Sequence, residues 1–178
     1  MKKDNQTSSI LVGGGARSGK SSFAQKMAED LPGRRVYLAT AQALDQEMEQ
    51  RIAKHQADRG SAWHATLEEP LNLTECLQRA GTDFDIILVD CITLWLANLM
   101  GRDDNDRQIL QEIDKLAATL NQFPATIILV SNEVGLGLVP EHPSGRRFRD
   151  LAGFANQRLA QACQEVYFTI WGLPQKLK

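Results

Sequence analysis

The sequence lacks the features that would place the protein in a membrane or outside the cell. No apolar run approaches the roughly 18 consecutive residues that are needed to cross a bilayer. Only three cysteines occur, Cys76, Cys91 and Cys163, and they are dispersed without a C-x-x-C pair. Such a set excludes a disulfide framework and is typical of reduced thiols in the cytosol. Residues 1–9 are polar and do not form a secretory signal, so we expect a cytoplasmic protein.

The sequence also lacks an excess of positive charge, internal repeats and low-complexity linkers. Its net charge is -2 and its pI is about 5.9. Domains that bind nucleic acid usually present a basic surface, so we expect no general affinity for nucleic acid. With 178 residues, 43% of them hydrophobic and 24% charged, the chain has the size and composition of one globular domain. We predict a frayed N-terminal extension over residues 1–9 and a single domain over residues 10–178.

What the sequence does contain is an alternation of short apolar runs and longer amphipathic ones. The apolar runs at 10–12, 36–39, 86–89, 126–130 and 166–170 predict strands. Helical patterns cover 19–30, 45–58, 70–80, 106–121 and 148–164. Strands that are apolar throughout and separated by helices belong in a parallel sheet with helices on both faces. The fold class is therefore predicted as α/β, with a mostly parallel central sheet flanked by helices.

The turn after the first predicted strand matches the phosphate-binding loop pattern G-x-x-x-x-G-K-[S/T] at every fixed position. Glycines let backbone N–H groups wrap a phosphate, and the N-terminus of the following helix adds partial positive charge. In such a loop Lys20 reaches the outer phosphates and the Ser21 hydroxyl binds Mg²⁺. The alternative is a glycine-rich turn that matches by chance, but the flanking strand and helix favour nucleotide binding. The predicted nucleotide-binding residues are Gly14, Gly15, Ala16, Arg17, Ser18, Gly19, Lys20 and Ser21.

P-loop proteins also need an acidic residue at the end of a neighbouring strand to hold the magnesium ion. Asp90 directly follows the apolar run 86–89, which is the expected setting. We therefore predict Ser21 and Asp90 as metal ligands. The alternative is that Asp90 caps a helix that begins just after it.

Three classes of P-loop protein remain open: a small-molecule phosphotransferase, a motor or switch, and a regulator that only binds nucleotide. The small size of the chain favours the phosphotransferase. Arg51, His55 and Arg59 recur at four-residue spacing and so share one face of the helix predicted at 45–58. Two guanidiniums beside an imidazole would suit a histidine that attacks a nucleoside triphosphate. On spacing alone, a solvated charged face is the favoured interpretation.

Further motifs follow in order along nearly the whole chain. They are the loop 14–21, 37–41, Met48, 51–52, His55, Arg59, Trp63, Glu68, 90–95, 131–135, 139–140, 148–150, Gly153, 156–157 and 172–174. In this order they resemble the bifunctional adenosylcobinamide kinase / adenosylcobinamide-phosphate guanylyltransferase family of cobalamin biosynthesis. Several motifs in the same order are far more specific than the phosphate-binding loop alone.

The resemblance implies two reactions in one protein. A kinase phosphorylates the aminopropanol hydroxyl of adenosylcobinamide with ATP or GTP. A transferase then moves GMP from GTP onto that phosphate through a guanylylated histidine. His55 is the matching histidine, so the resemblance makes His55 and Lys20 the expected catalytic residues. It also implies a RecA-like fold, a homotrimer, and nucleotide contacts from Ala39, Thr40, Ala41, Gln56, Ala57, Asp58, Arg59, Glu68 and Asp90.

The other histidines and a group of arginines are weaker candidates. His64 lies beside a tryptophan and is expected at the surface or in packing, and His142 lies in a proline-containing loop with a small chance of touching substrate. Arg146, Arg147 and Arg149 either bind phosphate from a closing loop or form a solvated helix start.

Two tryptophans and two rival functions complete the predictions. Trp95 and Trp171 are expected in the core or at a subunit contact rather than as platforms for a corrin ring. No isolated motif marks the corrinoid pocket. The rivals are a kinase that has lost the histidine route and a regulator that binds nucleotide without transferring it.

Overall fold

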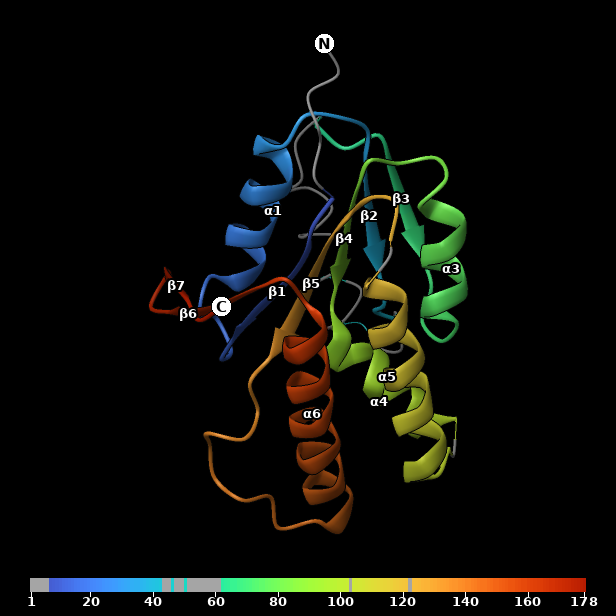
Figure 1. The fold of residues 1–178 in the computed structure, drawn as a ribbon. Coiled ribbons are helices and arrows are strands. Elements are labelled where there is room, and N and C mark those ends of the chain that lie inside the picture. Colours follow the sequence, from blue (N-terminus) through green and yellow to red (C-terminus); the bar gives the residue numbers. More distant parts are fainter. Residues whose placement is uncertain (1–6, 43–45, 47–49, 51–61, 103, 122) are drawn as a thin grey trace.

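The computed structural model has a seven-stranded sheet at its centre (Figure 1). It describes residues 7–42, 46, 50, 62–102, 104–121 and 123–178. The strand order is β3-β2-β4-β5-β1-β6-β7. All neighbouring strands pair in parallel except β6 and β7, which are antiparallel. The strands are β1 Ser9–Gly14, β2 Arg35–Ala39, β3 Ala65–Glu68, β4 Ile86–Asp90, β5 Thr126–Asn132, β6 Glu165–Ile170 and β7 Leu173–Lys176.

Helices cover both faces of this sheet, and each face has its own hydrophobic core (Figure 1). On one face Ile10 and Val12 of β1 pack in the same core as Ala24 and Ala28 of α1. Leu11 enters the core on the other face, beneath α3, α4, α5 and α6. Because successive strand residues enter opposite cores, the strands are apolar without alternation. The helices are α1 Lys20–Asp30, α3 Leu73–Ala80, α4 Ile92–Gly101, α5 Asp106–Leu120 and α6 Pro143–Ala162.

The parallel strands all end at one edge of the sheet, which positions the candidate site. β1 leads into the phosphate-binding loop, β4 ends at Asp90, and β5 lies between them. The predicted α/β fold with a mostly parallel sheet flanked by helices is confirmed. Within the described ranges, no helix is both long and apolar enough to cross a membrane.

The structure contains three elements that lie outside the predicted strand and helix ranges. β3 has only four residues, which alternate between half-buried and exposed, and it forms one edge of the sheet. α4 is apolar on most of its surface because it is buried between the sheet and its neighbours, so it lacks a helical polar face. β7 is exposed at all four residues and carries no hydrophobic signal.

Several predicted boundaries were wrong; α3, for example, begins at Leu73 rather than at 70. Ser9, assigned to the frayed segment 1–9, is buried in β1, and residues 1–6 of that segment lie outside the described residues. α6 begins at Pro143 rather than 148, because the His142 side chain caps the helix by accepting a hydrogen bond from Ser144 N at 3.3 Å. The helix predicted at 45–58 lies outside the described residues except for residues 46 and 50.

Candidate functional site

The backbone of the phosphate-binding loop adopts conformations that require glycine at two positions. Gly14 has φ 157° and Gly19, the N-cap of α1, has φ 90°. A Cβ atom at Gly14 would overlap the hydroxyl groups of Ser18 and Thr169. At Gly19 a Cβ would lie 3.0 Å from the Cα of Gly172. The fixed glycines of the motif are therefore needed for both backbone dihedral angles and close packing.

The C-terminal hairpin of β6 and β7 braces this loop. The Thr169 hydroxyl on β6 donates to Gly13 O at 3.1 Å, so the Ser18 hydroxyl, 2.8 Å away, donates to Thr169. Gly172 N donates to Ser18 O at 2.9 Å. These bonds within the chain fix the loop backbone, so binding a phosphate requires little further ordering.

Lys20 is the first residue of α1 and its side chain is directed back across the loop. Its ammonium donates to Gly15 O at 3.2 Å. Burial lowers the pKa of Lys20, while the nearby Asp90 carboxylate acts in the opposite direction. The half-buried ammonium is therefore close to both the loop backbone and Asp90, where it would contact the outer phosphates of a nucleotide.

Asp90 ends β4 and its carboxylate has a fixed orientation. Tyr37 on β2 donates its hydroxyl hydrogen to Asp90 Oδ2 at 3.0 Å. The N-cap of α4 is Cys91 rather than Asp90, so the helix-capping alternative for Asp90 does not hold. The Ser21 hydroxyl and the Asp90 carboxylate are hard oxygen donors, a set that fits Mg²⁺. In the described part of the chain, no group of three or more His, Cys, Asp or Glu side chains could hold a metal by itself.

Thr40, one of the predicted nucleotide contacts, has a structural role in the fold. Its side chain is fully buried, and its hydroxyl donates to Cys91 O at 2.7 Å and accepts from Cys91 N at 2.9 Å. Asn98 donates to Thr40 O at 2.8 Å. Because the hydroxyl hydrogen is already bonded, the Thr40 side chain cannot donate it to a nucleotide. These bonds instead fix the chain just after Asp90.

Replacing Thr40 by valine should destabilise the fold by about 1–3 kcal/mol, because the buried Cys91 N–H loses its partner. Urea denaturation would measure the change in unfolding free energy. Thr119→Val is the matched control, since the Thr119 hydroxyl makes an exposed bond within α5 and should change stability by less than about 0.5 kcal/mol. Weaker nucleotide binding with unchanged stability would contradict the structural role.

The Cys91 thiol beside the site is not a nucleophile. Burial, with a smaller effect from Asp90, raises the pKa of Cys91 to about 12, so the thiol remains protonated at neutral pH. All three cysteines are buried and free, as predicted for reduced thiols.

Glu68 lies in a second group of predicted residues, away from the loop. It ends β3 and pairs in register with Ala39, which in turn pairs with Asp90. Four strand spacings separate β3 from β1, which is about 19 Å at roughly 4.8 Å per strand. Of these residues, Asp90 on β4 is therefore nearest to the phosphate-binding loop, and Ala39 on β2 and Glu68 on β3 lie further along the sheet. Ala41 lies two residues beyond the end of β2. The predicted residues His55, Gln56, Ala57, Asp58 and Arg59 lie outside the described residues.

Comparison with known proteins identifies the family of this chain. The family model described as cobinamide kinase / cobinamide phosphate guanyltransferase matches residues 10–177. The chain is 48% identical to the bifunctional adenosylcobalamin biosynthesis protein CobP of Pseudomonas aeruginosa, over 94% of this chain and 96% of that protein. It is 41% identical to the bifunctional adenosylcobalamin biosynthesis protein CobU of Salmonella typhimurium, over 95% of this chain and 99% of that protein. The chain belongs to the cobinamide kinase / cobinamide phosphate guanyltransferase family.

A solved structure from Pyrococcus horikoshii supports the fold of this cobinamide kinase family member. It covers 96% of this chain and 86% of its own, with a TM-score of 0.60 and 8% sequence identity. At that identity the likeness concerns the fold alone.

Glu133 lies in the motif at 131–135 and is a candidate site residue whose role was not predicted from the sequence. It follows β5, the strand between the phosphate-binding loop and Asp90. Its backbone N–H donates to Gly14 O at 3.0 Å, and its carboxylate accepts from Gly135 N. An acidic residue directly after a buried strand was the available signal, the same signal that identified Asp90.

The weaker candidates are engaged in local structure. His64 Nδ1 accepts a hydrogen bond from Arg35 N at 3.2 Å, which agrees with a surface or packing role. Arg147 forms an ion pair with Asp106 at 2.6 Å, and Arg149 donates to Gly135 O at 2.8 Å. Arg146 donates a hydrogen bond to Pro140 O. Of the two tryptophans, Trp95 is buried in the core and Trp171 is exposed.

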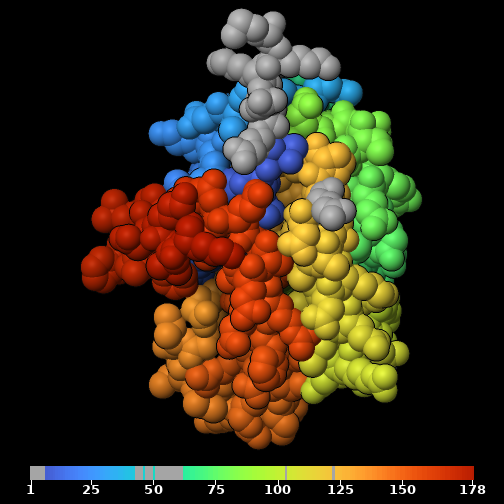
Figure 2. Space-filling model, viewed as in Figure 1, coloured from blue at the N-terminus to red at the C-terminus, as the bar shows by residue number. Residues whose placement is uncertain are grey.

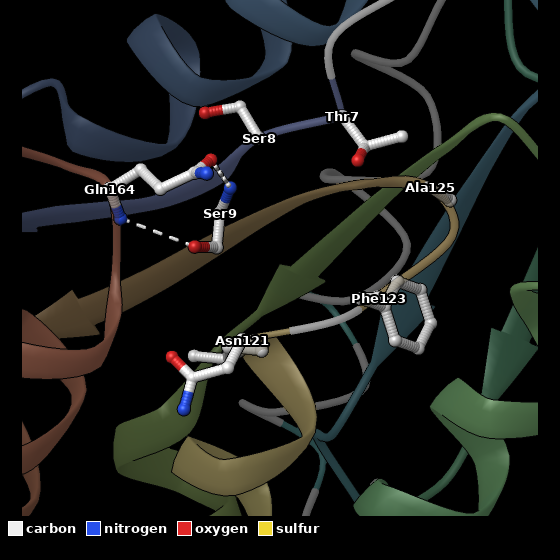
Figure 3. A pocket seen from close by; sticks show the side chains of 8 residues that line it. Thr7, Ser8, Ser9, Asn121, Phe123, Ala125 and Gln164 are labelled. Carbon is white, nitrogen blue, oxygen red and sulfur yellow. Dashed lines mark hydrogen bonds between the residues drawn. The ribbon is translucent and has the colours of Figure 1, made fainter.

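A pocket at the opposite edge of the sheet has no catalytic groups (Figure 3). Ser9 at the start of β1 and Gln164 before β6 are joined there by two hydrogen bonds of 3.2 Å. Its lining contains no ionisable side chain: Thr7, Ser8, Ser9, Leu120, Asn121, Phe123, Ala125 and Gln164. The chemistry is therefore expected at the edge that carries the phosphate-binding loop.

Proposed function

We propose that this chain catalyses both reactions in its family's name, phosphorylation of adenosylcobinamide and transfer of GMP to the resulting phosphate. The observation that supports this most directly is the braced phosphate-binding loop, with Lys20 and Asp90 at the same sheet edge. ATP or GTP is the phosphate donor, and GTP is the source of GMP.

In the kinase step, the substrate hydroxyl oxygen attacks the γ-phosphorus while the bond to the bridging oxygen breaks, which releases ADP or GDP. The loop N–H groups and Lys20 stabilise the negative charge on the transferred group. The hydroxyl proton leaves to a carboxylate, and Glu133 stands between the loop and Asp90 for this role. Ser21 and Asp90 would hold Mg²⁺, which neutralises phosphate charge.

In the transferase step, His55 attacks the α-phosphorus of GTP, an N–P bond forms, and pyrophosphate leaves. A phosphate oxygen of adenosylcobinamide phosphate then attacks the same phosphorus. The N–P bond breaks, adenosylcobinamide-GDP leaves, and the histidine is regenerated. The support for His55 is its place in the family motif.

We further propose a cytoplasmic homotrimer that binds a corrinoid and no nucleic acid. The net charge of -2 and the three free cysteines support the location and the lack of nucleic-acid binding. The family resemblance supports the trimer.

An assay that follows adenosylcobinamide, its phosphate and its GDP derivative by chromatography tests the proposal. With GTP and Mg²⁺ we expect the phosphate to rise first and the GDP derivative, together with pyrophosphate, to follow. Accumulation of the phosphate alone would indicate the kinase-only rival. Nucleotide binding without corrinoid turnover would indicate the regulator.

A further inference from the structure

The turn that joins β6 and β7 lies directly against the phosphate-binding loop. It consists of Trp171 and Gly172. Gly172 N donates to Ser18 O at 2.9 Å, and the Gly172 Cα lies where a Cβ on Gly19 would be only 3.0 Å away. In Figures 1 and 2 this hairpin (red) projects at one side of the molecule, next to α1.

Trp171 is an unfavourable residue for this turn. Trp171 has φ 52° and Gly172 has φ 80°, and Ile170 pairs with Leu173 around them. A two-residue hairpin turn with both φ angles positive prefers Asn, Asp or Gly at its first position. A bulky aromatic residue there is strained, and strain of this kind is concentrated at functional sites.

The Trp171 side chain is also 93% exposed, the largest aromatic surface left open in the described chain. Trp95 is fully buried, and the Trp63 indole N–H donates to Glu29 at 3.0 Å. The local cost of Trp171 in the turn is therefore not offset by packing against the part of the chain that the structure describes.

The sheet order determines which part of a nucleotide this turn faces. Asp90 lies on β4, to one side of the loop strand β1, and Lys20 is close enough for their charges to interact. The outer phosphates and the metal belong on that side. β6 pairs with the opposite side of β1. The nucleoside part of a bound nucleotide, extending from the loop in the direction away from Asp90, would therefore lie against the β6–β7 turn.

We propose that Trp171 stacks on the purine base of the nucleoside triphosphate held by the phosphate-binding loop. This inference rests on the proposed nucleotide binding at that loop. Stacking on an aromatic ring accepts adenine and guanine alike, because both bases have a π-face. A site of this kind is consistent with phosphate transfer from either ATP or GTP.

Trp171→Asn tests the proposal, because asparagine suits the turn and removes only the stacking surface. By calorimetry, we expect a non-hydrolysable ATP analogue to bind about 5- to 100-fold more weakly than to the wild type. Inorganic triphosphate, which lacks a base, should bind both proteins equally. The thermal midpoint of Trp171→Asn should be unchanged or higher.

Tryptophan fluorescence provides a second measurement. Nucleotide should quench the wild-type emission, and the quenching should be largely absent in Trp171→Phe, which keeps an aromatic ring and should bind within a few-fold of the wild type. Equal affinity of the ATP analogue for the wild type and Trp171→Asn would overturn the inference. The inference would also fail if Trp171→Asn lost affinity for inorganic triphosphate as much as for the ATP analogue. A change in the sedimentation of Trp171→Asn without a base-specific loss of affinity would indicate a subunit contact instead. If the wild type bound neither ligand, the proposed function itself would fail.

Discussion

His55→Ala is expected to lose formation of adenosylcobinamide-GDP by at least about 10³-fold while it retains the kinase step. The imidazole is the proposed nucleophile, and removal of a covalent nucleophile eliminates the route that it opens. Incubation with GTP labelled in the α-phosphate, with Mg²⁺, should leave an acid-labile and base-stable label on the wild type. The same incubation should leave no label on His55→Ala.

His64→Ala is the matched control for this experiment. His64 is exposed and its imidazole accepts a hydrogen bond from Arg35 N, so truncation of the side chain should leave the label and both activities intact. A label that persists in His55→Ala, or its absence from the wild type, would rule out the covalent mechanism.

Lys20→Met is expected to reduce kcat/KM for both reactions by about 10²–10³-fold. Methionine keeps most of the length of the side chain but removes the charge that stabilises the transferred phosphate. The protein should remain folded, because among the described residues the Lys20 side chain makes one hydrogen bond, to Gly15 O. Steady-state assays of corrinoid phosphorylation and of GMP transfer measure the two effects.

The control for Lys20 is Lys26→Met, an exposed position on the same helix, which should leave both rates within about two-fold. Loss of the kinase step alone in Lys20→Met would show that GTP for the transfer step binds elsewhere. The second group of residues, around Ala39 and Glu68, would then be the candidate binding site for that GTP.

Local patterns were sufficient to predict the central strands and the phosphate-binding loop. The loop is one contiguous motif whose glycines meet a backbone requirement at Gly14 and Gly19, and Asp90 directly follows an apolar strand. The brace between Ser18 and Thr169 joins residues 151 positions apart, and neither residue carries a local signal of that contact.

The roles of individual residues were harder to predict than their positions. The family motif marks Thr40, but only the structure shows that its hydroxyl is bonded to the backbone of Cys91. Trp171 was expected in the core or at a subunit contact, and the core alternative is wrong because the side chain is exposed. Whether an exposed aromatic residue meets a base or a subunit depends on which strands are neighbours, which is information that no local pattern contains.

The strand that carries the phosphate-binding loop also constrains the order in which the protein can mature on the ribosome. β1 is synthesised well before its two partners in the sheet, because β5 begins at Thr126 and β6 at Glu165. A nascent chain that ends before Thr169 lacks the hydroxyl that bonds to Gly13 O and Ser18. The nucleotide site is therefore assembled only after Thr169, 151 residues beyond Ser18, has been synthesised.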